Sequence, residues 1–179
     1  NPTYLNYFRT GSGMAMCNMF NYEEKVRTNV QNDNFQTSEM TPAGKDFAMA
    51  EEVLTCFHAD PNVITWTTYT YGRGFADVHR RFAQAFLALP DMRGKIVNDA
   101  TAPVDGDVRV RTYDTKNGVY VGVVSKKMHA ADFTVSVPAT GTTIVNLVTG
   151  TETPVEAKDG KISFVVKSNA MELNSFLVE

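Results

Sequence analysis

The hydrophobic pattern of this chain changes its period close to Pro90, and this change constrains the fold more than any other feature. Ahead of Pro90, apolar residues recur every three or four positions, as they do along one face of a helix. Beyond it they alternate with polar residues up to Val178, as they do in strands with one buried face. The pattern predicts an α+β chain, in which a short, partly helical segment over residues 1–93 precedes an antiparallel β-sandwich over residues 94–179.

A hairpin is the clearest local signal in the second part. Alternating runs at 108–113 and 119–123 flank Asn117-Gly118, a pair that favours tight hairpin turns in which both turn positions need positive φ. Further strands, separated by glycine-containing turns, are expected at 132–137, 143–147, 161–166 and 172–178. Short strands with turns at intervals of about 8–12 residues are typical of a β-sandwich.

The segment before Pro90 contains one buried strand candidate and one extended stretch. Residues 13–20 form a nearly continuous apolar run, which suits a strand buried on both faces, as in a parallel sheet. Residues 63–71 are rich in β-branched and aromatic side chains, which favour an extended conformation. This is too little material for a domain by itself, and we therefore expect the chain to be the last part of a larger protein.

Two amphipathic helices are expected in the same segment. The first should span residues 42–58, because Thr41 can cap it and a proline at the first helical position loses no hydrogen bond. The second should span residues 76–89 and end at Pro90. The two apolar stripes should pack through four side chains, Phe47, Leu54, Phe82 and Phe86.

The composition excludes several classes of function. With 43% hydrophobic and 21% charged residues the chain resembles ordinary folded proteins, and a net charge of −3 with scattered Lys and Arg predicts no nucleic-acid surface. No apolar run approaches the ~20 residues that a membrane-spanning helix needs. Cys17, Cys56 and the histidines share no metal-ligand spacing, so we expect buried thiols and no metal site.

Four stretches of the second part carry a family resemblance. They are VYVGVV at 119–124, VNLVTG at 145–150, KISF at 161–164 and MELNSFLV at 171–178. Together they resemble the C-terminal β-sandwich of many glycoside hydrolases, a small antiparallel domain that packs against a (β/α)8 catalytic barrel. In that pattern an arginine is common where Asn174 stands, and an asparagine is common where Ser125 stands.

The first part is similar to the end of such a barrel. Residues 13–20 with the following loop look like the last barrel strand, and residues 40–44 look like the start of the closing helix. The resemblance implies a polysaccharide-degrading hydrolase that is secreted or periplasmic, with agarase- or porphyranase-like enzymes as one candidate group. It implies two partners, the remainder of the catalytic barrel and a polysaccharide or oligosaccharide substrate, and it calls for no cofactor.

Carboxylates that follow the predicted strand at 13–20 are candidate substrate contacts. Glycoside hydrolysis uses two carboxylates on either side of the scissile bond, and in barrels such groups stand at the carboxyl ends of strands. Tyr22, Glu23 and Glu24 occupy that kind of position. Adjacent residues of an extended chain point in opposite directions, so Glu23 and Glu24 cannot form the catalytic pair. We therefore assign no catalytic residue; one glutamate lines a substrate subsite, or both belong to a solvated loop.

Aromatic residues after position 65 are the second candidate group. Trp66, Tyr69 and Tyr71 precede a Gly-Arg-Gly turn and offer flat surfaces on which sugar rings can stack. The alternative is that they fill the core between the helices and the sandwich.

Two other functions stay open at the level of the sequence. The chain could be a non-catalytic carbohydrate-binding module with a helical preface, or a structural interaction domain without sugar contact. The amphipathic helical half argues against a lone module, because a sandwich by itself does not need it. If the chain is the end of a barrel hydrolase, the isolated 179 residues should be inactive.

Overall fold

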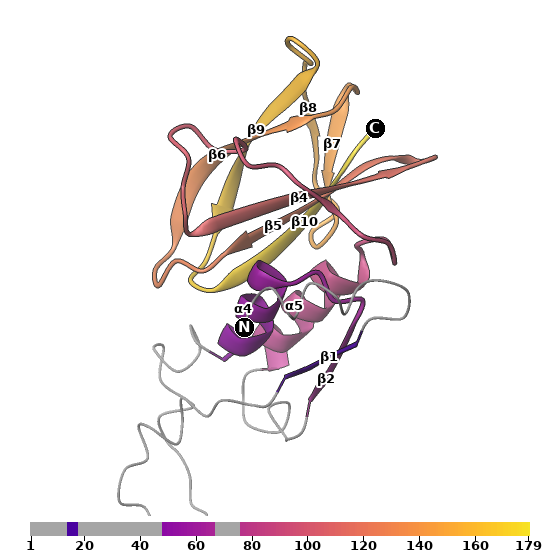
Figure 1. Ribbon diagram of the computed structural model, residues 1–179. Coiled ribbons are helices and arrows are strands. Elements are labelled where there is room, and N and C mark those ends of the chain that lie inside the picture. The colour runs from indigo at the N-terminus through magenta and orange to yellow at the C-terminus, as the bar shows by residue number, and fades with distance from the viewer. Residues whose placement is uncertain (1–13, 18–47, 67–75) are drawn as a thin grey trace, which may run out of the picture.

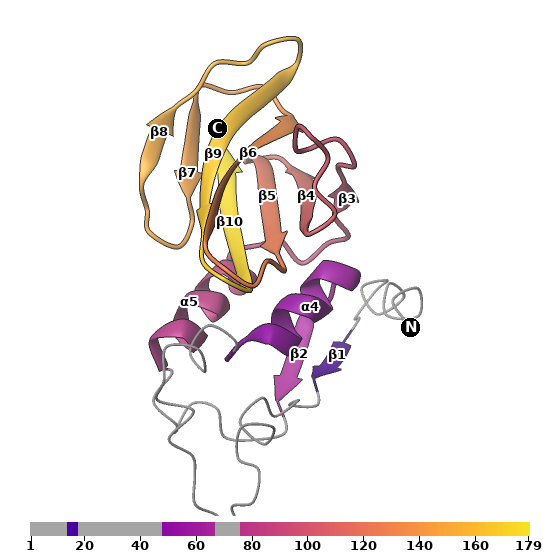
Figure 2. The same cartoon turned by 90° about the vertical axis from the view of Figure 1, so that its left-hand side faces the viewer.

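The computed structural model describes residues 14–17, 48–66 and 76–179. A sandwich of two antiparallel sheets lies on two helices, and a parallel pair of strands lies beyond the helices (Figures 1 and 2). The first part contains β1 (Met14–Cys17), α4 (Ala50–His58), β2 (Val63–Trp66) and α5 (Ala76–Leu87). The second part contains β3 (Lys95–Ile96), β4 (Val108–Thr115), β5 (Gly118–Ser125), β6 (Ala131–Pro138), β7 (Thr143–Asn146), β8 (Glu152–Pro154), β9 (Lys161–Ser168) and β10 (Glu172–Val178).

The sandwich confirms the predicted α+β class and its antiparallel half. One sheet has the order β3-β4-β5-β10-β7-β8, and the other pairs β6 with β9. Alternating side chains of the two sheets meet in a common core, among them Val110, Val121, Val135, Ile162 and Val166. Burial of one face of each sheet is the reason why the sequence alternates there. The predicted strands at 132–137, 143–147, 161–166 and 172–178 correspond to β6, β7, β9 and β10.

The predicted hairpin is present between β4 and β5, but its turn differs from the expected one. Thr115 pairs with Gly118, so the chain reverses through Lys116 and Asn117, and Gly118 has positive φ, at 127°. The Thr115 hydroxyl accepts a hydrogen bond from the Asn117 amide and donates one to the Gly118 carbonyl, which stabilises this alternative turn. Gly118 is required for a second reason, since a Cβ there would collide with the Val178 carbonyl oxygen.

The first part confirms a parallel strand within the apolar run at 13–20. β1 runs parallel to β2, and α4 lies between them in the sequence. Strand β2 covers the beginning of the extended stretch predicted at 63–71, and the rest of that stretch lies outside the described residues.

Both helices are shorter than the apolar pattern predicted. Ala48 and Met49 form a turn, so α4 begins at Ala50 rather than at residue 42, and α5 ends at Leu87 rather than at residue 89. Met49 has φ −111° and ψ 20°, which is not a helical conformation, so the helix starts after it. Its side chain makes no capping hydrogen bond. Residues 41–47, the predicted start and cap, lie outside the described residues.

A second core joins the helices to the outer face of the larger sheet. Val53 and Phe57 of α4 and Phe82 of α5 are buried against Val124 of β5 and Leu173 of β10. Of the four side chains predicted to make this contact, Phe82 is buried, Phe86 is partly buried, Leu54 is half-buried and Phe47 lies outside the described residues. Ala50, Val53, Cys56 and Phe57 of α4 are buried, and so is Met49 just before the helix.

Replacement of Phe82 by alanine should destabilise the protein by about 3–5 kcal/mol, because the ring leaves a cavity at a site that is only 4% exposed. Urea-induced unfolding measures the loss. Leu87→Ala is the matched control on the same helix, since Leu87 is 79% exposed and should change the stability little. Equal losses for the two variants would contradict the placement of α5.

Candidate functional site

The strands β1 and β2 end at the same edge of the parallel pair. Cys17 at the end of β1 lies opposite Trp66 at the end of β2. The segment with Tyr22, Glu23 and Glu24 follows β1 in the sequence, and the segment with Tyr69 and Tyr71 follows β2.

These site residues themselves lie outside the described residues, apart from the backbone of Trp66. The structure therefore fixes where their two segments leave the sheet. The carboxyl end of a parallel sheet is the edge at which α/β proteins bind ligands, and it is the edge that these segments leave.

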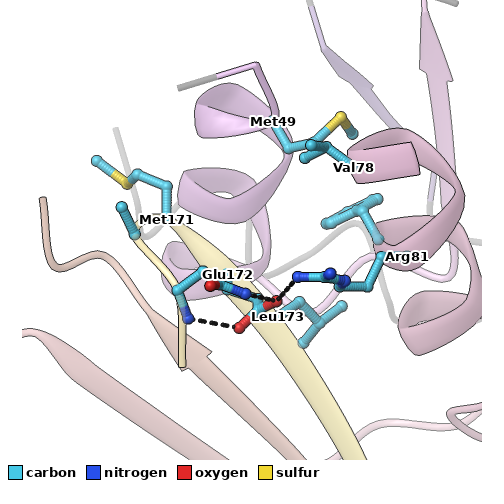
Figure 3. A pocket seen from close by; sticks show the side chains of 9 residues that line it. Met49, Val78, Arg81, Met171, Glu172 and Leu173 are labelled. Atoms are coloured by element: carbon cyan, nitrogen blue, oxygen red, sulfur yellow. Dashed lines mark hydrogen bonds and ion pairs between the residues drawn. The ribbon is translucent and has the colours of Figure 1, made fainter. Parts of the chain in front are cut away.

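A cavity that the sequence did not predict lies where the helices meet the sandwich (Figure 3). It has a volume of about 200 Å³ and is bounded by the residue that precedes α4, by α5 and by the chain around the start of β10. Its lining combines apolar side chains with three polar ones, Arg81, Asn169 and Glu172.

Glu172 is held rigidly at this cavity. Its Oε2 accepts hydrogen bonds from the Asn169 amide at 2.7 Å and from Asn174 Nδ2 at 3.3 Å. Its Oε1 accepts from Asn169 Nδ2 at 2.9 Å and from Arg81 Nη1 at 3.2 Å. Four donors occupy the lone-pair positions of the carboxylate, which suits a positioning group better than a general acid or base.

A second polar cluster joins the end of α4 to the sandwich. Arg111, which is 4% exposed, donates to the carbonyl oxygens of Cys56 at 2.6 Å and Phe57 at 3.3 Å. Burial lowers the pKa of the Arg111 guanidinium, and the nearby Asp60 carboxylate opposes that shift. Asp60 accepts in turn from the Tyr113 hydroxyl at 2.8 Å and from a backbone amide. The cluster is buried, and its hydrogen bonds attach the end of α4 to strand β4 of the sandwich.

The sequence pattern predicted neither the Arg81–Glu172 cluster nor the Arg111 cluster. Arg81 belongs to an Arg-Arg pair that reads as solvated surface, and its partner Glu172 is 91 positions away. The partners of Arg111 are 54 and 55 positions away. Contacts of this range leave no periodic trace in the sequence.

The residues that the structure describes form neither a metal-ligand cluster nor a membrane-spanning helix. No group of three or more His, Cys, Asp or Glu side chains in that part of the chain is placed to hold a metal ion. No helix there is long and apolar enough to cross a membrane. Cys56 is buried, as predicted.

Comparisons with known proteins give distant likenesses. No protein-family model and no curated protein matches the sequence. A maltogenic alpha-amylase from Thermotoga neapolitana is 11% identical, with a TM-score of 0.49 over 99% of this chain and 46% of that chain. An endoxylanase of glycoside hydrolase family 30 from Clostridium papyrosolvens is 15% identical, with a TM-score of 0.42 over 96% of this chain and 52% of that chain.

A family 30 xylanase from Clostridium acetobutylicum is 14% identical, with a TM-score of 0.46 over 76% of this chain and 39% of that chain. The chain thus spans at most 52% of the length of these three proteins. All three are glycoside hydrolases, and none is an agarase or a porphyranase. Similarity this distant assigns no activity to the chain.

Replacement of Arg111 by glutamine should lower the free energy of unfolding by about 2–3 kcal/mol, because it removes charged hydrogen bonds to two carbonyl groups at the end of α4. Chemical denaturation measures the change. Arg109→Gln is the control: its guanidinium lies 5.0 Å from the Phe57 ring, a contact worth about 0.5–1 kcal/mol. A loss at Arg111 no larger than that at Arg109 would show that the anchor contributes little.

The stability of the protein should fall as the pH drops below 6.5. Burial, and then the charges of Lys126, Arg109 and Arg111, lower the pKa of His58 from its ordinary value of 6.5. Between 6.5 and the lowered value the unfolded chain binds more protons than the native one, so acidification favours unfolding.

Denaturation at a series of pH values tests this expectation. His58→Gln should reduce the dependence of the unfolding free energy on pH below 6.5. Adding His79→Gln to this variant should reduce it further, because burial also lowers the pKa of His79. His129→Gln, at an exposed position, is the matched control. An unchanged profile in the His58 variant would contradict the expectation.

Proposed function

We propose that this chain is the C-terminal portion of a polysaccharide-degrading glycoside hydrolase. Residues 1–93 would close the catalytic (β/α)8 barrel, and residues 94–179 would form the accessory sandwich that stabilises it. The observation that carries the proposal is the parallel pairing of β1 with β2 in the order β1-α4-β2-α5. The resemblance of the sandwich strands to glycoside hydrolase C-terminal domains adds to it.

A parallel pair of this size calls for further strands. β1 and β2 have four residues each, and within the described part of the chain each pairs only with the other. Parallel strands occur almost entirely in larger sheets whose two faces are covered. Val63 of β2 is 43% exposed, and a mostly apolar hollow of about 450 Å³ lies between β2 and α5. An adjoining strand and helix of a barrel would cover this surface.

The substrate would bind at the carboxyl edge of the pair. One of Glu23 and Glu24, with Tyr22, would contact the sugar from the segment after β1, and Trp66, Tyr69 and Tyr71 would stack on it from the segment at the end of β2. Barrel enzymes build their active sites from loops at this edge. The catalytic carboxylates would come from other barrel strands, because Glu23 and Glu24 are adjacent and face opposite ways when extended. A polymeric substrate also favours a secreted or periplasmic enzyme.

The test compares the 179-residue chain with the protein encoded by its complete reading frame, on xylan, starch and agarose. We expect the complete protein to release reducing sugars and the 179-residue chain to release none, because a catalytic pair needs carboxylates from separate strands. Glu23→Gln and Glu24→Gln in the complete protein should raise KM more than they lower kcat if either residue lines a subsite.

Two outcomes would overturn the proposal. One is a reading frame that encodes no barrel strands ahead of β1, which would favour a carbohydrate-binding module or a structural domain. The other is robust hydrolysis by the 179-residue chain that Glu23→Gln or Glu24→Gln abolishes, which would make this part of the protein an enzyme by itself.

A further inference from the structure

We propose that the cavity between α5 and the start of β10 is an accessory sugar-binding site that holds one monosaccharide unit. The choice of a sugar as ligand rests on the proposed function, whereas the site itself rests on its own residues. Those residues lie where the helices meet the sandwich (Figure 3).

Arg81 supplies the hydrogen-bonding side of the cavity. Its side chain is 52% exposed, and among the described residues its guanidinium donates one hydrogen bond, to Glu172. A guanidinium carries five N–H donors in a planar fork, so most of them are available to oxygen atoms of a ligand. Hydroxyl and ring oxygens of a sugar are acceptors of the required kind.

The charge of the cavity favours a neutral ligand over an anion. Glu172 lies 3.2 Å from Arg81 and offsets its positive charge. Glu172 accepts four hydrogen bonds from protein groups, and one of them holds the Arg81 guanidinium in place. The contacts to a ligand would therefore come from Arg81. A hydroxylated, uncharged molecule satisfies such a donor without bringing a second negative charge beside Glu172.

The remaining lining suits the other face of a sugar ring. Met49, Val78 and Met171 contribute aliphatic and thioether surface, and Phe82 and Leu173 add further apolar surface. Methionine side chains adapt to irregular shapes, and apolar surface packs against the C–H face of a pyranose. With about 200 Å³, the cavity is smaller than the ~300–1,000 Å³ of sites for drug-sized ligands, so it accommodates a single ring.

The backbone at the rim of the cavity is held in place by hydrogen bonds within the protein. Met171 has φ 45°, a left-handed backbone conformation that is uncommon for a residue with a bulky side chain. Its amide donates to the Lys127 carbonyl at 2.9 Å, and Glu172 beside it is fixed by Asn169 and Asn174. Strained residues of this kind cluster at ligand sites, where the surroundings hold them.

Titration calorimetry of the 179-residue chain with maltotriose, xylotriose and agarotetraose tests the site. We expect at least one of them to bind, and we expect Arg81→Gln to weaken that binding roughly tenfold or more, as loss of a charged hydrogen bond does. Arg80→Gln is the matched control: it removes the same charge from the neighbouring residue, which does not line this cavity. It should bind like the unchanged chain.

A second variant keeps the ion pair and fills the space. Val78→Phe should abolish binding with Arg81 and Glu172 intact, and thermal unfolding confirms that each variant is folded. Absence of binding for all three sugars, or equal affinities of the Arg81→Gln and Arg80→Gln variants, would overturn the inference.

The outcome is independent of the test of the catalytic proposal. Hydrolysis by the complete protein without Arg81-dependent binding would refute the accessory site alone. Arg81-dependent binding without any hydrolysis by the complete protein would refute the enzyme and leave a carbohydrate-binding domain.

Discussion

The buried guanidinium of Arg111 is the contact on which the arrangement of the two parts depends. The last carbonyl groups of a helix have no partner within the helix, and they carry the negative end of its dipole. Arg111 brings a positive charge and two donors from the middle of β4 to the carbonyls of Cys56 and Phe57. Desolvation lowers the pKa of Arg111, and the Asp60 carboxylate opposes this shift in part. The end of α4 is thereby fixed on the sheet.

Because α4 is fixed there, the larger sheet is covered on both faces. Phe176 and Val178 of β10 face the core of the sandwich, whereas Leu173 faces the helices. Every residue of β10 is accordingly buried, which explains why its sequence is a mixed apolar run rather than a strict alternation. The helices also contact β2 through Ile64, so they form a middle layer between the sandwich and the parallel pair (Figure 2).

The sequence predicts those parts of the fold that depend on local burial, and fails where distant segments meet. Alternation found β6, β7, β9 and β10, but it missed β3 and β8, which have two and three residues and carry too little pattern. Alternation also placed Arg111 among the polar side chains of β4. It is buried because α4 covers it, and α4 is more than 50 positions away. The Arg81–Glu172 pair escaped prediction for the same reason.

The middle position of the helices indicates how the sandwich would support the proposed substrate site at the edge of the parallel pair. One side of α4 and α5 is anchored through Arg111 and Phe82 to a rigid sheet, and the other side supports β1 and β2. The helices thereby set the position of the carboxyl edge of the parallel pair. Trp66 lies at this edge, and the segment that carries Glu23 starts from it. Precise placement of site groups requires such support, because small displacements reduce catalysis and binding strongly. The sandwich would therefore act as a positioning element, and its polar anchor would matter to the site without touching a substrate.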